Sequence, residues 1–97
     1  MIPSSTLSSE EVLLLQLAKA HDQVEVGAIY THYRNHTRYK VTGLAILEAT
    51  QEVGVLYHQE AGSDPSKAIP WIRPISSFLE KVHTEDTLIH HFQKNQP

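Results

Sequence analysis

The sequence predicts a mainly β fold: a small, strongly bent β-barrel or sheet of about five strands, preceded by one α-helix. Three observations support this prediction. Residues 7–23 place apolar side chains at helical spacing, and residues 24–58 alternate with a period of two between short turns. A further short strand, residues 71–73, follows a loop rich in Gly, Ser, Asp and Pro. The 97 residues suit one small domain.

The helix begins with a recognisable start signal. Ser8 and Glu11 have the spacing of a capping box, and Leu7 and Val12 have the spacing of a hydrophobic staple around it. The apolar stripe that follows consists of Val12, Leu13, Leu14, Leu15, Leu17 and Ala18. Such a stripe typically covers one end of a sheet. Because leucine is abundant in so short an element, a homodimer formed through the helix is the alternative interpretation.

The strands follow in order along the chain. The first places Val26, Ala28, Tyr30 and His32 on one face, and the second, from residue 38 to residue 48, places Tyr39, Val41, Gly43, Ala45 and Leu47 on one face. Between them residues 34–37 read as a turn, in which we expect Asn35 to adopt the left-handed conformation. After a turn at residues 49–52, the third strand covers residues 53–58.

The last third of the chain is less regular. Pro74 ends the strand at residues 71–73, and residues 76–81 are expected to form a helical turn capped by a serine. The tail from His83 fits either a helix or a final strand. A three-stranded meander cannot bury both of its faces, so we expect a fourth and a fifth strand to close the barrel. We therefore divide the chain into a tail and helix, residues 1–22, and a β-barrel domain, residues 23–97.

Composition and charge restrict the function classes. The chain has no cysteine, which excludes disulfides and thiolate chemistry, and its net charge of −3 argues weakly against a general polyanion binder. The apolar run from Val12 to Leu15 is far shorter than the roughly 20 residues of a membrane span, and it follows acidic residues. We expect a cytoplasmic protein that does not interact with membranes.

Aromatic and basic side chains form the candidate binding surface. The candidate ligand-binding residues are Tyr30, His32, Arg34, Tyr39, Tyr57, Trp71 and Arg73. Arginine beside aromatic rings allows cation–π contact and recognition of phosphate or carboxylate. The competing interpretation is that these are ordinary strand residues, with Arg73 paired to Glu52 or Glu48 inside the fold.

Catalysis and metal binding have weaker support. The signature motifs of P-loop, dinucleotide-binding, serine-hydrolase and zinc-protease sites are missing. The chain has seven histidines, but His32 and His36 lie across a turn, and adjacent His90 and His91 would point to opposite faces of a strand. We therefore predict no catalytic residue, no metal ligand and no cofactor. The sequence leaves enzyme activity open but favours a protein that is not an enzyme.

Several motifs occur in a fixed order: a glycine followed by Y-x-H-Y-[KR], then Y-x-V-x-G-x-A, E-x-x-V-x-Y and [VI]-R-P-x-x-x-F. The matching residues are Gly27, Tyr30, His32, Tyr33, Arg34, Tyr39, Val41, Gly43, Ala45, Glu52, Val55, Tyr57, Ile72, Arg73, Pro74 and Phe78. In these motifs the chain resembles a widespread bacterial family of small domains of unknown function, over roughly residues 25–82 with a weaker continuation to Phe92. The resemblance implies an SH3-like barrel and a candidate surface, and it implies no activity.

The chain also departs from the pattern that the family shows. Asn35 stands where relatives have glycine, and Leu47 and Ala49 replace a histidine and a glutamate. His91 and Phe92 stand where relatives often have an Arg-Phe pair. If the polar stretch on the second strand performs chemistry in relatives, this chain lacks two of its residues.

The leading functional hypothesis is a non-catalytic binding module that recognises a peptide or another anionic ligand on an aromatic and basic groove. A nucleic acid would fit the same side chains but is not strongly indicated. One alternative is a small enzyme or nucleotide-related accessory domain using His32 and Arg73. Another is a structural protein that forms homodimers.

Overall fold

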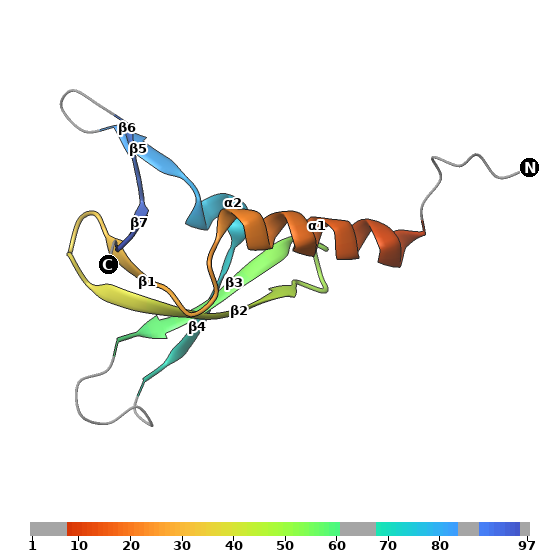
Figure 1. Ribbon diagram of the computed structural model, residues 1–97, viewed down its shortest axis with the longest axis horizontal. Helices are drawn as coiled ribbons and strands as arrows, with labels where there is room; N and C mark the ends of the chain where they lie inside the picture. Colours follow the sequence, from red (N-terminus) through yellow and green to blue (C-terminus); the bar gives the residue numbers. More distant parts are fainter. Residues whose placement is uncertain (1–7, 61–67, 84–87, 96–97) are drawn as a thin grey trace, which may run out of the picture.

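The computed structural model describes residues 8–60, 68–83 and 88–95, in which strands dominate and one long helix crosses one end of the main sheet (Figure 1). The elements in chain order are α1 (Ser9–Gln23), β1 (Ile29–His32), β2 (Arg38–Ile46), β3 (Val53–Gln59), β4 (Pro70–Pro74), α2 (Ile75–Phe78), β5 (Lys81–His83), β6 (Leu88–His90) and β7 (Phe92–Lys94). Five strands form an antiparallel sheet in the spatial order β4-β3-β2-β1-β7, while β5 and β6 form a separate two-stranded sheet. The fold class predicted from the sequence is confirmed.

Helix α1 starts where the capping signal predicts. The Ser8 hydroxyl accepts a hydrogen bond from the Glu11 backbone N–H at 3.1 Å, and the Glu11 carboxylate accepts one from the Ser8 N–H at 3.2 Å. The predicted staple includes Leu7, which lies outside the described residues. The helix packs on β2 and β3, so the prediction that it covers one end of the sheet is confirmed.

The β1–β2 turn differs from the prediction in one backbone detail. The left-handed residue is His36, with φ 59°, and not Asn35. The Asn35 side chain instead accepts a hydrogen bond from the Thr37 N–H at 2.9 Å, which is the side-chain turn that asparagine favours. Asn35 therefore stabilises the turn through its amide, and the next residue adopts the positive φ.

Strand β2 contains a β-bulge at Thr42. Val41 pairs with Tyr57 and Gly43 pairs with Leu56, so Thr42 has no paired residue in β3, although its hydroxyl donates to the Leu56 carbonyl at 3.2 Å. Because the extra residue resets the alternation, Leu44 packs toward the core beside Val55, and the predicted continuation of that face through Gly43, Ala45 and Leu47 is wrong. A bulge also bends the strand that contains it, which helps the sheet to curl.

The core lies inside the curled sheet. The rings of Phe78, from α2, and Phe92, from β7, stack at 4.5 Å with an angle of 7° between their planes. Other buried side chains surround them: Val24 at the end of α1, and Tyr30, Val41, Val55 and Tyr57 from the strands.

The last third of the chain contains a short helix and several short strands. The helical turn is present, but it begins at Ile75 after Pro74, and no side chain caps it. The described part of the ambiguous tail contains two strands, β6 and β7, and β7 pairs with β1, which places Phe92 opposite His32. The last strand therefore lies beside the first, and β4 and β7 form the two edges of the five-stranded sheet. In the part of the chain that the structure describes, no helix combines the length and apolarity needed to span a membrane.

Candidate functional site

Two of the predicted ligand-binding tyrosines are buried. Tyr30 is only 5% exposed; its ring packs edge-on against Phe78, and its hydroxyl accepts a hydrogen bond from the Glu25 N–H at 3.0 Å. Tyr57 is also buried, but its hydroxyl reaches Arg73. The ring of Tyr30 thus belongs to the core, whereas the hydroxyl of Tyr57 is part of the polar surroundings of Arg73.

The Phe92 ring brings together residues from four other strands. The rings of His32, Tyr39 and Tyr57 meet it nearly edge-on, at centroid distances of 5.1, 5.8 and 5.7 Å. The Arg73 guanidinium lies 5.1 Å above the same ring, within the range of a cation–π contact. We call the whole assembly the aromatic–basic cluster; it consists of His32, Tyr33, Arg34, Tyr39, Tyr57, Trp71, Arg73, His91 and Phe92.

Arg73 is the most informative member of the cluster. It is half-buried, and its Nε and Nη1 donate to the Tyr57 hydroxyl at 3.2 Å and the Ser77 hydroxyl at 3.0 Å. Among residues 8–60, 68–83 and 88–95, no carboxylate lies within ion-pair distance of it. Glu52, one of the two acids considered as its partner, instead accepts a hydrogen bond from the Ser76 hydroxyl at 2.5 Å. The contacts of this half-buried cation within the described residues are two neutral hydroxyls and the Phe92 ring, so no opposite charge balances it there.

His32 lies at the end of β1 beside other basic groups. Its Nδ1 accepts a hydrogen bond from the Arg34 N–H at 3.2 Å, and its ring lies 4.9 Å from the His91 ring. The pKa of His32 is lowered, first by burial and then by the positive charges of His91, Arg73 and Arg34. Because Nδ1 is an acceptor, the neutral ring carries its proton on Nε2 and is a hydrogen-bond donor there.

The remaining predicted residues lie at the rim of the cluster. Arg34 is exposed; its guanidinium lies 5.7 Å from the Tyr33 ring centroid and donates to the Tyr33 hydroxyl at 3.2 Å. Trp71 is 50% exposed and lies opposite Tyr57 in the β3–β4 pairing, two residues before Arg73 and on the same face of β4. The structure thus places six of the seven predicted residues in the cluster, and Tyr30 beneath it.

Sequence reasoning missed the contribution of residues 91 and 92. The His91 backbone bridges two segments, because its N–H donates to the Glu80 carbonyl at 2.8 Å and its carbonyl accepts from the Tyr33 N–H at 2.9 Å. Its Nδ1 is buried without a hydrogen-bond partner and lies 3.8 Å from a Glu80 carboxylate oxygen. The signal that could have identified this position was the Arg-Phe pair of relatives, where a second cation would precede the central phenylalanine.

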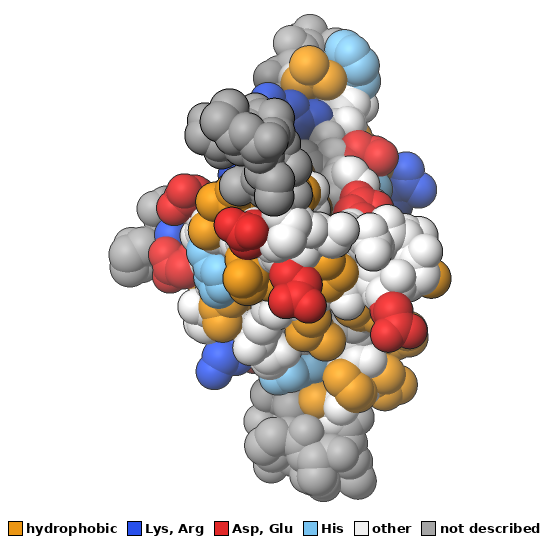
Figure 2. All heavy atoms as spheres, turned by 90° about the vertical axis from the view of Figure 1, so that its right-hand side faces the viewer, with side chains coloured by type: hydrophobic (Ala, Val, Ile, Leu, Met, Phe, Trp, Pro, Cys, Tyr) orange, Lys and Arg blue, Asp and Glu red, His pale blue; other side chains and the backbone are white. Residues whose placement is uncertain are grey.

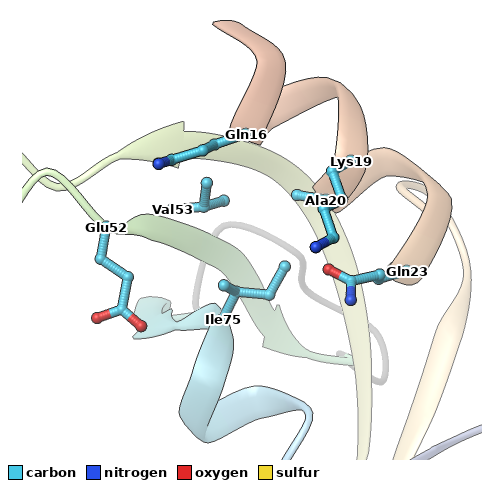
Figure 3. A pocket seen from close by; sticks show the side chains of 7 residues that line it. All are labelled: Gln16, Lys19, Ala20, Gln23, Glu52, Val53 and Ile75. Carbon is cyan, nitrogen blue, oxygen red and sulfur yellow. The ribbon is translucent and has the colours of Figure 1, made fainter. Parts of the chain in front are cut away.

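A shallow hollow lies elsewhere, between α1 and the start of β3. Figure 3 shows Gln16, Lys19 and Gln23 on the helix side and Glu52 on the strand side, around a floor of apolar side chains. Its volume is about 210 Å3, below the range of about 300 to 1,000 Å3 that is typical of small-molecule pockets. One cation and one carboxylate among neutral amides leave no dominant charge, so the aromatic–basic cluster is the stronger candidate site.

No metal centre emerges from the histidines. In the described ranges of the chain, no three or more His, Asp or Glu side chains gather in a way that could hold a metal ion.

The fold and the cluster define a small, mainly β domain with a basic, aromatic end. A family model described as "Protein of unknown function (DUF1653)" matches residues 28–94, and the chain therefore belongs to this family. The match includes every residue of the aromatic–basic cluster and leaves α1 outside. Searches of curated proteins and of solved structures found no match.

Proposed function

We propose that the protein is a binding module that recognises an anionic segment of a polypeptide at the aromatic–basic cluster. The observation that carries this proposal is the Arg73 guanidinium, which is half-buried and has no carboxylate partner in the described part of the chain. A carboxylate or phosphate on a ligand would complete its coordination. Charge-assisted hydrogen bonds of this kind are stronger than those to neutral groups.

The neighbouring groups reinforce the preference for an anion. After burial, the nearby basic groups His91, Arg73 and Arg34 contribute to the lowered pKa of His32, in keeping with a gathering of basic side chains at this site. The only acid within ion-pair distance of a cluster member, among the described residues, is Glu80 beside His91. Neutral His32 adds a donor at Nε2.

A peptide fits this surface better than a nucleic acid. The cluster holds only two permanent cations, Arg34 and Arg73, and the whole chain has a net charge of −3. Nucleic-acid binding draws most of its affinity from many phosphate contacts, which so few cations cannot supply. The exposed ring of Trp71 provides an apolar anchor beside Arg73, as expected for a peptide with one or two acidic groups next to an aromatic or aliphatic residue.

The hydrogen bond at His32 also bears on the enzyme alternative. A general base must present an unprotonated nitrogen to its substrate. In His32 the acceptor nitrogen, Nδ1, already accepts a hydrogen bond from the Arg34 N–H, which leaves Nε2 as a donor. This arrangement favours recognition of an anion over proton abstraction.

The test is an NMR titration of the full chain with peptide pools that contain aspartate, glutamate or phosphoserine, each matched by a pool with neutral side chains. We expect acidic pools to shift the Trp71 indole and Arg73 Nε signals and neutral pools to leave them unchanged. Arg73→Gln should weaken binding at least about tenfold, because a charge-assisted contact is lost.

The matched control is Arg38→Gln, which removes an arginine of β2 that pairs with Glu60 at 3.3 Å, outside the cluster. It should leave affinity unchanged. If oligonucleotides bind and acidic peptides do not, with an affinity that falls steeply with salt, the peptide proposal is wrong and a nucleic acid replaces it. If no pool shifts either signal, the binding-module proposal itself is wrong.

A further inference from the structure

The outer face of α1 exposes leucines that nothing in the described chain covers. Leu14 is 64% exposed and Leu15 is 58% exposed, whereas Leu13, Leu17 and Ala20 turn toward the sheet. The side of the helix that faces away from the sheet therefore also carries leucines, which flank Glu11 and Ala18. Exposed apolar side chains that lie close together are a feature of association surfaces.

We propose that two copies of the chain associate through this face, with their α1 helices antiparallel and crossing between Leu14 and Leu15. At that crossing, Leu14 of one copy lies level with the partner's Leu15. Ala18 lies one turn further along the same face, and its small side chain lets the two helices approach closely.

Charge selects the antiparallel orientation. The acids Glu10 and Glu11 lie in the first turn of α1, and its last turns carry Lys19 and His21 together with one acid, Asp22. With the crossing between residues 14 and 15, the first turn of one helix lies level with residues 18–21 of its partner, so each acidic start adjoins the segment that contains Lys19 and His21. A parallel pair would instead place the glutamates of both copies together, where like charges repel.

The shape of the molecule permits this contact. Toward its N-terminus α1 extends past the β2–β3 turn, away from the sheet (Figure 1). Figure 2 views this end: hydrophobic and acidic side chains lie side by side near the centre of the face, and Lys and Arg lie toward its margin. The β7 end lies on the other side of the molecule, so the helix pair leaves both aromatic–basic clusters accessible.

The contact is small, because it involves one face of a helix of 15 residues. Stable complexes bury about 800 Å2 per partner, and a single helix face offers less. We therefore expect a reversible dimer with a dissociation constant on the order of 10–100 μM.

Analytical ultracentrifugation of the full chain across this concentration range tests the association. The wild type should shift from monomer to dimer, and Leu15→Glu should weaken the dimer at least about tenfold by placing like charges at its centre. The matched control is Ile69→Glu, because Ile69 has the same exposed fraction, 58%, on another surface. A wild type that is monomeric at every concentration, or a dimer weakened equally by both substitutions, overturns the proposal.

Single cysteines test the orientation, since the chain has none of its own. In the antiparallel pair, residue 15 lies about 1.5 Å along the axis from its symmetry mate, whereas residue 18 lies about 10 Å from its mate. Leu15→Cys should therefore form an intermolecular disulfide under mild oxidation and Ala18→Cys should not, given the short Cα separation that a disulfide requires. Equal cross-linking at both positions would indicate a parallel pair and overturn the antiparallel arrangement.

Discussion

The β7 end of the molecule and the α1 end use their apolar side chains in opposite ways. At the β7 end, Phe92 is buried among aromatic rings, and the Arg73 guanidinium lies over it with no acidic partner among the described residues. At the α1 end, Leu14 and Leu15 face solvent, while the polar capping groups of the helix are fully satisfied. Within the described ranges, Arg73 has no opposite charge at the first end and Leu14 and Leu15 have no apolar cover at the second, so we propose a ligand for the first end and a second copy for the other.

The largest expected effect is at the β7 end. Phe92→Ala removes a ring that is stacked on Phe78 and only 4% exposed, and it leaves a cavity at the centre of the core. We expect a loss of about 3–5 kcal/mol in the free energy of unfolding, measured by urea denaturation. Phe92→Leu should lose clearly less, because it fills part of the cavity. A loss below about 1 kcal/mol for the alanine variant would show that the ring is not central to the core.

A smaller effect is expected at the start of α1. Ser8→Ala removes the hydroxyl that accepts the Glu11 N–H, so the first turn of the helix loses half of its capping box. The free energy of unfolding should fall by about 1 kcal/mol. Ser8→Asp is the control, because aspartate accepts the same hydrogen bond and should retain most of the stability. Equal losses for both variants would contradict the capping role.

Truncation of an exposed leucine gives the sharpest contrast with Phe92. Leu14→Ala, measured at a concentration where the chain is monomeric, should change the free energy of unfolding by no more than about 0.5 kcal/mol. The side chain contributes little burial, and alanine is a good helix former. A loss approaching that of Phe92→Ala would mean that Leu14 is buried within the monomer, and the contrast between the two ends would disappear.

The smallest effect concerns pH at the β7 end. The pKa of His32 lies below its usual value of 6.5 in the folded chain, so the unfolded chain binds the proton more readily. Stability attributable to His32 is therefore present above pH 6.5 and is lost as the pH falls through the interval below it.

Denaturation midpoints measured between pH 7 and pH 5 should accordingly fall more steeply for the wild type than for His32→Gln. His36→Gln is the control, because that exposed turn histidine has no part in the cluster. Identical slopes for the wild type and His32→Gln would contradict the effect. An anionic ligand at Arg73 favours the protonated form of His32, so its affinity should rise over the same interval.

Local patterns in the sequence predicted local structure well. The capping box of α1 and the two-residue period of the strands depend on neighbours a few positions apart. The structure confirms the capping box, and it confirms the period in β1 from Ile29 and in β2 as far as Val41, whereas Val26 and Ala28 lie before the first strand. The bulge at Thr42 was not predicted, because no residue in β2 signals an unpaired position; it follows from the pairing of β2 with β3.

The sequence predicted most residues of the candidate site but not Phe92, the residue at its centre. The sequence identified the aromatic and basic side chains, yet it could not show that Phe92 joins them, since β7 pairs with a strand 60 residues earlier, with Phe92 opposite His32. It also could not show that Tyr30 is buried or that Arg73 bonds hydroxyls and not a carboxylate. Those facts depend on how distant strands meet, which alternation along one strand does not specify.

The bulge in β2 also determines how the strand tolerates changes in length. In a regular strand, removing one residue turns every following side chain to the opposite face. In β2, loss of Thr42 would restore strict alternation and leave Val41 and Leu44 pointing inward as before, at the expense of the local bend. A one-residue deletion at this position would therefore leave the same residues in the core. It would change the curvature that brings the two ends of the sheet around Phe78 and Phe92.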